Sequence, residues 1–271
     1  MSMWRGALSA MFLVCAAGVA QAQPQRAPMP PAIEAPQDAA YPGGVITLEI
    51  DATDTARGIF RGRERIPLAN DEPITLLYPQ WLPGNHAPRG PMNLFAGLEV
   101  RANGERVAWR RDPVNVYAFH VDPPAGAREL EVTFQFLSPT QTSQGRVVMT
   151  PTMLNLQWNA MLLYPAGHYV RQVRIRPTVT FPKGWRAFAA LDGGEGPAVT
   201  ATPGTAAPNT VTWAETDSET LVDSPIFAGL HAGRWDLGQD VAMNVVADDP
   251  KLLAIKPENI ATYRNLVNEA V

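Results

Sequence analysis

The chain has 271 residues, enough to bury a hydrophobic core in one large domain or two smaller ones. Aliphatic and aromatic residues make up 46% of it, a globular composition that excludes wholesale disorder. The formal net charge is −4 and no block of Lys or Arg interrupts the sequence, so we expect no nucleic-acid partner.

Residues 1–22 have the layout of a secretory signal peptide. Arg5 supplies the positive charge, an apolar run follows, and Ala20-Gln21-Ala22 forms an A-x-A cleavage site. The apolar run is too short to span a bilayer, so we expect no membrane contact after cleavage. Cys15, the single cysteine, is removed with the signal, which leaves neither thiol nor disulfide in the mature protein. The sequence therefore predicts a periplasmic or secreted protein whose fold depends on packing alone.

Residues 23–44 form a Pro/Ala-rich segment and predict an extended, mobile leader. The alternative is a strand docked on the domain that follows. Six prolines argue against that alternative, because proline has no backbone donor.

Short segments that alternate apolar and polar residues follow, and each predicts a half-buried strand. They lie at 45–51, 98–101, 106–110, 129–136, 173–181, 210–213 and 241–246. Asn103-Gly104 suits a type I′ hairpin turn, and Pro177 indicates a sheet edge or a bulge. Residues 193–208 are small and predict an exposed connection between strands. The series predicts an all-β domain over 45–248, built as a β-sandwich or a saddle-shaped antiparallel sheet.

The pattern changes to a helical period in residues 249–271. Pro257 suits the first turn of a helix, and apolar side chains then recur at spacings of three and four. These residues are Ile260, Tyr263, Val267 and Ala270. We expect one C-terminal helix that begins a further domain outside this chain, and we expect its apolar face to lack a partner here.

Three amide side chains alternate with apolar residues between Gln144 and His168. They are Asn155, Gln157 and Asn159. Alternate residues of a strand share a face, so the pattern predicts a row of amides on one surface of a strand over Leu154–Leu163. Such a row can bind the polar groups of a ligand, and it can equally be a ladder that supports neighbouring loops.

The loop at 81–91 is the second candidate site, because Pro and Gly give it a fixed, irregular path. His86 and Arg89 could meet a carboxylate there, and the alternative is a rigid loop that braces the domain. His120 lies on a predicted strand and is interpreted as a structural histidine. Because no two of the four histidines lie at metal-ligand spacing along a helix, the sequence predicts no metal site.

Four segments, in the same order, resemble the N-terminal domain of the glycyl-aminopeptidase family of zinc metallopeptidases. They are YPQWLPGNHAPRGP at 78–91, RDPVNVYAFH at 111–120, QGRVVMTPTMLNLQWNAMLLYPAGH at 144–168 and LVDSPIFAG at 221–229. The resemblance covers roughly residues 45–271. It implies an exported metallopeptidase whose zinc lies in a thermolysin-like catalytic domain of the same polypeptide, at a helical H-E-x-x-H site with a downstream glutamate. No histidine of this chain is followed by a glutamate, so we expect no cofactor and no catalytic residue here, and no activity of this chain alone.

In gluzincin aminopeptidases a strand of the N-terminal domain approaches the active-site cleft and offers a polar side chain to the free amine of the substrate. The segment Leu154–Leu163 is similar to that strand. The resemblance implies that Gln157, with Asn155 and Asn159, binds the amino terminus of a peptide substrate, since an amide oxygen accepts from an ammonium group. The alternative is a stand-alone exported β-sandwich module that binds peptide or glycan through the amides and Trp81 or Trp158.

The signal-peptide interpretation makes a direct prediction about the mature protein. N-terminal sequencing of the exported chain should begin at Gln23, because charge, apolar run and A-x-A site coincide before it. A cytoplasmic product that retains Met1 would contradict the interpretation.

Overall fold

The computed structural model describes residue 29 and residues 32–82, 84–194 and 209–271. The predicted signal peptide and most of the small-residue connection at 193–208 lie outside the described residues. Ala32–Val271 forms one compact unit. Within the described ranges, no helix has the length and apolarity needed to cross a membrane.

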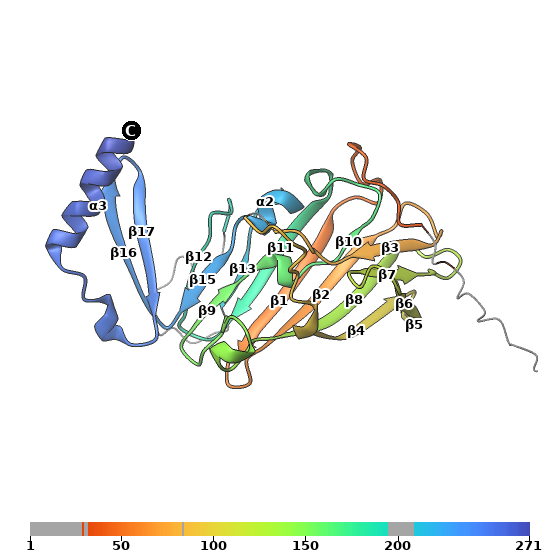
Figure 1. Ribbon diagram of the computed structural model, residues 1–271, viewed down its shortest axis with the longest axis horizontal. Coiled ribbons are helices and arrows are strands. Elements are labelled where there is room, and N and C mark those ends of the chain that lie inside the picture. Colours follow the sequence, from red (N-terminus) through yellow and green to blue (C-terminus); the bar gives the residue numbers. More distant parts are fainter. Residues whose placement is uncertain (1–28, 30–31, 83, 195–208) are drawn as a thin grey trace, which may run out of the picture. The chain divides into compact units, whose positions relative to one another are not determined.

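An eight-stranded sheet dominates the fold (Figure 1). In spatial order its strands are β13 (Asn209–Thr212), β11 (Arg174–Phe181), β1 (Ile46–Asp54), β2 (Ile59–Pro67), β8 (Glu129–Leu137), β4 (Phe95–Ala102) and β5 (Glu105–Val107), and β14 (Thr216–Asp217) also pairs with β11. β1 and β11 are parallel, and the other pairs of this sheet are antiparallel. The predicted all-β fold is confirmed, with one parallel pair that the alternation of residues does not reveal.

Three smaller sheets complete the β-structure of the described residues. The first contains β10 (Tyr164–Pro165), β3 (Ile74–Leu77), β7 (Ala118–Val121) and β6 (Trp109–Arg111). The second contains β12 (Arg186–Phe188), β15 (Ile226–Gly229) and β9 (Met153–Leu156), and the third is the hairpin of β16 (His231–Gly238) and β17 (Val241–Ala247). The α-helices of the described residues are α2 (Ser218–Val222) and α3 (Pro257–Ala270), and short 3-10 helices span Met92–Leu94, Thr142–Gln144, Trp158–Ala160, Val170–Gln172 and Pro250–Leu253.

The hydrophobic core lies between one face of the large sheet and the first two smaller sheets. Alternate residues of β1 and β8 are buried, as their sequence pattern predicts, and β2, for which no strand was predicted, is buried at alternate residues as well. They join one apolar cluster with residues from β3, β7, β9 and β15, including Leu76, Phe119, Leu154 and Ile226. Each fully buried aliphatic or aromatic side chain of this kind contributes roughly 1.5–3 kcal/mol through the hydrophobic effect.

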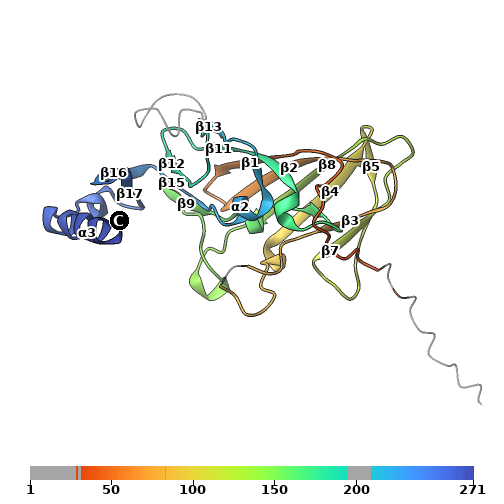
Figure 2. The same ribbon diagram turned by 90° about the horizontal axis from the view of Figure 1, so that it is seen from above.

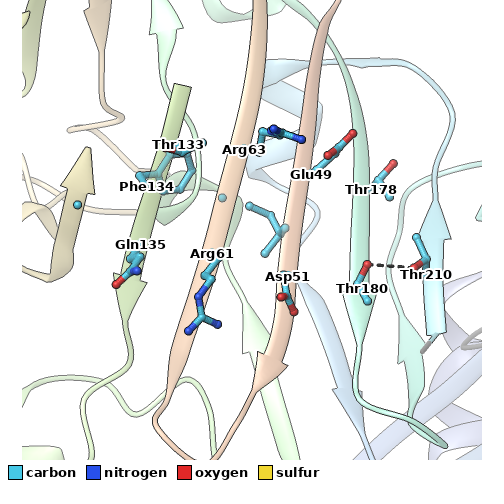
Figure 3. Close-up of a pocket in the computed structure, with 13 residues that line it drawn as sticks. Glu49, Asp51, Arg61, Arg63, Thr133, Phe134, Gln135, Thr178, Thr180 and Thr210 are labelled. Carbon is cyan, nitrogen blue, oxygen red and sulfur yellow. Dashed lines mark hydrogen bonds between the residues drawn. The ribbon is translucent and has the colours of Figure 1, made fainter. Parts of the chain in front are cut away.

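The opposite face of the large sheet carries polar side chains (Figure 3). They surround a shallow depression of about 600 Å³, and they satisfy one another across the strands. Arg63 pairs with Glu131 at 3.0 Å, and the hydroxyls of Thr180 and Thr210 lie 3.0 Å apart. We interpret this as a solvated outer face.

Two local predictions about backbone geometry are confirmed. Asn103 and Gly104 have φ of 54° and 80°, the left-handed values that a type I′ turn requires between β4 and β5. Pro177 lies where the partner of β11 changes from β14 to β13, so its missing N–H falls at an irregularity in the ladder.

The predicted mobile leader is wrong for its last residues, which are docked on the domain. Gln37 forms a parallel bridge with His168, and the backbone N–H of Tyr169 donates to the carbonyl of Gln37 at 3.1 Å. The Tyr41 hydroxyl donates to the carbonyl of Pro67 at 2.6 Å. The prolines of this segment flank these residues rather than replace them, so the backbone donors of Gln37 and Tyr41 remain available.

The predicted C-terminal helix is confirmed as α3, but the expectation that its apolar face lacks a partner is wrong for Ile260. Ile260 is buried, and α3 packs against β16 (Figures 1 and 2). The Arg264 guanidinium donates to the carbonyl of Asp236 on β16, with N–O distances of 3.1 and 2.9 Å. Tyr263, by contrast, is 45% exposed.

One carboxyl group lies within the core. Glu64 of β2 is fully buried, and the backbone N–H of Leu163 donates to both of its oxygens at 3.0 and 3.2 Å. Burial raises the pKa of Glu64 well above its usual range, and the Leu163 hydrogen bond only partly opposes this. Glu64 therefore links the large sheet to the segment that follows β9.

The raised pKa of Glu64 predicts a pH-dependent effect of Glu64→Gln. Between the usual glutamate pKa of about 4.3 and the raised value, the folded chain binds more protons than the unfolded chain, so this residue destabilises the fold as pH rises. Glutamine does not ionise, so the variant does not lose stability as the pH rises. Its free energy of unfolding relative to that of the parent should therefore increase by up to about 1.4 kcal/mol per pH unit in that window. Urea denaturation at several pH values measures the difference. Glu49→Gln on the exposed face of β1 is the matched control, and parallel curves for Glu64→Gln and the parent would contradict the prediction.

Candidate functional site

The three predicted amides line one cavity of about 670 Å³, which we call the amide cavity. Its walls come from the loop around residues 82–94, the segment 144–148 and the stretch 155–161. Its polar lining consists of Asn85, Arg89, Asn93, Tyr117, Gln144, Arg146, Asn155, Gln157 and Asn159. Apolar residues such as Leu94, Phe136 and Met161 lie between them.

The single strand predicted over Leu154–Leu163 is wrong. β9 ends at Leu156, Gln157 keeps an extended backbone, and Trp158–Ala160 forms a 3-10 turn. Trp158 causes this path, because its indole is fully buried and its Nε1–H donates to the carbonyl of Ser224 at 3.0 Å. The turn nevertheless leaves the three amides on the same cavity.

Hydrogen bonds give the amides different roles. Asn155 donates to the carbonyl of Ile226 on β15 at 3.4 Å and accepts from Nε2 of Gln157 at 3.1 Å. Asn155 is therefore a support, as the ladder interpretation expects. The Gln157 oxygen stays available as an acceptor at the cavity, and the carboxamide of Asn159 makes no hydrogen bond to another described residue.

Backbone contacts hold the loop at 81–91 in place beside the cavity. The N–H groups of Arg89 and Gly90 donate to the carbonyl of Gln80 at 2.8 and 3.3 Å. Arg89 lines the amide cavity, whereas His86 is not among its lining residues, so the expected pair does not converge there. Arg146 lines the cavity as well, and sequence reasoning missed it because it belongs to no pattern.

The charge of the amide cavity is one-sided. Its described lining contains two guanidinium groups and no Asp or Glu. Neither Arg89 nor Arg146 forms an ion pair with another residue of the described chain, although both are exposed. The site can therefore donate hydrogen bonds to an anionic or carbonyl oxygen and offers amide oxygens as its acceptors.

His120 is a structural histidine, as predicted. Its Nε2 lies 2.8 Å from Asp112 Oδ2 and its Nδ1 lies 3.0 Å from Thr75 Oγ1. Asp112 also accepts from the backbone N–H groups of Asn115 and Val114, and these bonds together with His120 lower its pKa. The arrangement anchors the β6–β7 loop. Among the residues that the structure describes, no three His, Cys, Asp or Glu side chains gather as a metal site requires.

The sequence comparison identifies the family. Residues 47–230, more than half of the chain, match the family described as the peptidase M61 N-terminal domain. This chain belongs to that family. The resemblance drawn from the four segments is confirmed, and the chain carries a peptidase M61 N-terminal domain. No curated protein matches the sequence.

One of the solved structures that this chain resembles shows a similar fold within a larger protein. An aminopeptidase N family protein from Idiomarina loihiensis superposes with a TM-score of 0.58 at 15% identity, over 74% of this chain and 32% of that chain. The M1 zinc metallopeptidase from Deinococcus radiodurans gives 0.41 at 12% identity, over 80% of this chain and 48% of that one. Leukotriene A4 hydrolase from Saccharomyces cerevisiae gives 0.42 at 9% identity, over 74% and 30%. The M61 domain chain thus spans about a third of the first of these proteins.

The different roles of the amides predict different costs of truncation. Asn155→Ala should lower the free energy of unfolding by about 1–3 kcal/mol, because the Ile226 carbonyl and the Gln157 amide lose their partner. Asn159→Ala, the matched control, should cost less than Asn155→Ala, because it breaks no hydrogen bond to another described residue. Urea denaturation measures both, and equal costs would contradict the division between support and ligand-facing amide.

Proposed function

We propose that this M61 N-terminal domain belongs to an exported zinc aminopeptidase, covers its active-site cleft and helps to bind the amino terminus of the peptide substrate. The single observation that carries the proposal is the convergence of Gln157, Asn155 and Asn159 on one cavity. Family membership supports the aminopeptidase class. Residues 1–22 support a periplasmic or secreted location.

Gln157 is the residue that we assign to the substrate's free amine. Its Nε2 is occupied by Asn155, which orients the carboxamide and leaves Oε1 as an acceptor. That oxygen can accept a hydrogen bond from an ammonium group without adding a charge to the cavity. Asn155 then acts as a positioning residue, and Asn159 offers a second amide on the same wall.

The catalytic domain of the same polypeptide is the proposed partner, and peptides are the proposed substrates. Zinc bound in that domain would polarise the scissile carbonyl and activate water. The proposal assigns no catalytic residue to the present chain, whose residues bind and orient the substrate. Because the proposal places the zinc and the catalytic residues in the other domain, it predicts that the present chain alone hydrolyses no peptide.

A second candidate function is a stand-alone module that binds peptide or glycan. Trp158 is fully buried, so its ring is not available to contact a ligand in this alternative. Trp81 remains, since it is 60% exposed and borders a cavity of about 450 Å³ with Tyr164 and Tyr169. Exposed aromatic rings can pack against either a peptide or a glycan. This candidate therefore predicts ligand binding that depends on Trp81 and not on Gln157.

The proposal predicts the effect of Gln157→Ala in the chain joined to its catalytic domain. Loss of one hydrogen bond to a charged group should weaken binding of free-amine substrates by roughly 1.5–3 kcal/mol. Zinc content should not change, because Gln157 is not a metal ligand in this proposal. Steady-state kinetics with a free-amine peptide and metal analysis measure both quantities.

Gln135→Ala is the matched control, because Gln135 is an amide on the outer face of the large sheet (Figure 3). It should leave the Michaelis constant and turnover unchanged. An unchanged Michaelis constant and turnover in Gln157→Ala would refute the assignment of Gln157, and a loss of zinc would show that its role is structural.

A further inference from the structure

We infer that the amide cavity also binds a carboxylate of the substrate, through Arg89 and Arg146. This inference deepens the proposed function and rests on it. It names the substrate class as short peptides that carry a free C-terminal carboxylate or an acidic side chain within reach of the cavity. In this arrangement the amine of the peptide binds at Gln157 and its carboxylate binds at Arg89 and Arg146.

The composition of the lining is the first step. The described walls bring together two guanidinium groups and several neutral amides, and they contain no carboxylate. The two guanidinium groups would repel an ammonium group placed beside them, so the substrate's amine is assigned to the amide wall at Gln157 and not to the arginines. A carboxylate finds two cations and the N–H donors of neighbouring carboxamides.

The missing partners of the two arginines are the second step. On the outer face of the large sheet, arginines pair with carboxylates of the same face: Arg61 with Asp54 at 2.7 Å, and Arg63 with Glu131 at 3.0 Å. Arg89 and Arg146 face the amide cavity and make no such pair within the described chain. The outer face thus supplies carboxylate partners to Arg61 and Arg63, whereas no described carboxylate pairs with Arg89 or Arg146.

The origin of the two side chains is the third step. Arg89 belongs to the loop held by the carbonyl of Gln80, and Arg146 follows the 3-10 turn Thr142–Gln144. Two separate segments therefore bring a guanidinium to one cavity. A guanidinium is a planar fork that matches the two oxygens of a carboxylate, which a lysine ammonium does not.

The test is a titration of the ¹⁵N-labelled chain with a short peptide, Gly-Gly-Ala, followed by NMR. Three probes are compared: the free peptide, its C-terminal amide and its N-acetyl derivative. A fourth probe, Gly-Glu-Ala with an amidated C-terminus, places the carboxylate on a side chain and distinguishes the two sources of the same group. Shifts of the side-chain N–H signals of Asn155, Gln157 and Asn159 report binding at the cavity.

The inference predicts that amidation of Gly-Gly-Ala weakens binding and that the glutamate peptide regains part of the loss. Arg89→Gln and Arg146→Gln should each weaken binding of the free peptide by up to about fivefold, the upper range for an exposed ion pair. Arg89→Lys should fall between parent and Arg89→Gln, because it keeps the charge and loses the fork. Added salt should reduce the affinity of the free peptide and not that of its amide.

Arg57→Gln is the matched control, because Arg57 is exposed and pairs with Asp54 outside the amide cavity. It should bind the free peptide as the parent does. Circular dichroism and thermal unfolding of each variant show whether the fold is retained.

The outcomes distinguish this inference from the proposed function. Equal affinity for the free peptide and its amide, with parent-like binding in both arginine variants, overturns the carboxylate site. If N-acetylation still weakens binding in that case, and Gln157→Ala removes the difference, the proposed function stands. No saturable shift at the cavity with any probe, up to the solubility of the peptides, overturns both.

Discussion

The burial of Trp158 is the constraint on which the amide cavity depends. Its indole is fully buried, meets the ring of Trp213 edge-on at 6.4 Å between centroids and donates to the carbonyl of Ser224. Truncation of a buried tryptophan typically lowers the free energy of unfolding by about 3–5 kcal/mol. The stability of the fold therefore depends strongly on the buried position of this indole. Because Trp158 points into the core, its neighbours Gln157 and Asn159 are directed to the cavity wall. The position of the amides is thus a consequence of core packing.

A second buried contact fixes the other end of the same segment. The N–H of Leu163 donates to Glu64, which lies on β2 in the middle region of the large sheet. A carboxyl group with no cationic partner among its described contacts is costly to bury in ionised form, and its raised pKa shows that the neutral form is favoured. The retained contact satisfies a backbone donor that would otherwise be buried without a partner. The segment between Trp158 and Leu163 is therefore held at both ends by polar contacts within the core.

The large features of this fold could be predicted because they depend on local patterns. Period-two alternation predicts β1, β8 and β17, and Asn103-Gly104 predicts the hairpin turn, since both signals are written in adjacent residues. The 3-10 turn after Gln157 could not be predicted in this way. The alternation of amides continues through it, and the indole contact with Ser224 that produces the turn joins residues 66 positions apart.

The docked leader and Arg146 were missed for a related reason. Gln37 finds its partner at His168, and Arg146 reaches the amide cavity only because the chain brings the segment after Gly145 beside β9. No periodicity at either position indicates these neighbours. The three amides were found, in contrast, because they occupy alternate positions of one short segment. The convergence of the amides with Arg89 required the tertiary structure.

The two parts of the amide cavity differ in how firmly they are held, and this difference bears on the proposed ligand. Asn155 and Asn159 are buried, and Gln157 between them is fixed through Asn155, so the amide wall is rigid. Arg89 and Arg146 are exposed, and their long side chains lack partners within the described chain. Each such side chain has several rotamers available and loses up to about 2 kcal/mol of rotamer entropy when it is ordered. A rigid amide wall suits a group of constant position, such as the amine of every substrate. Adaptable arginines suit a carboxylate whose distance from that amine varies with the length and sequence of the peptide.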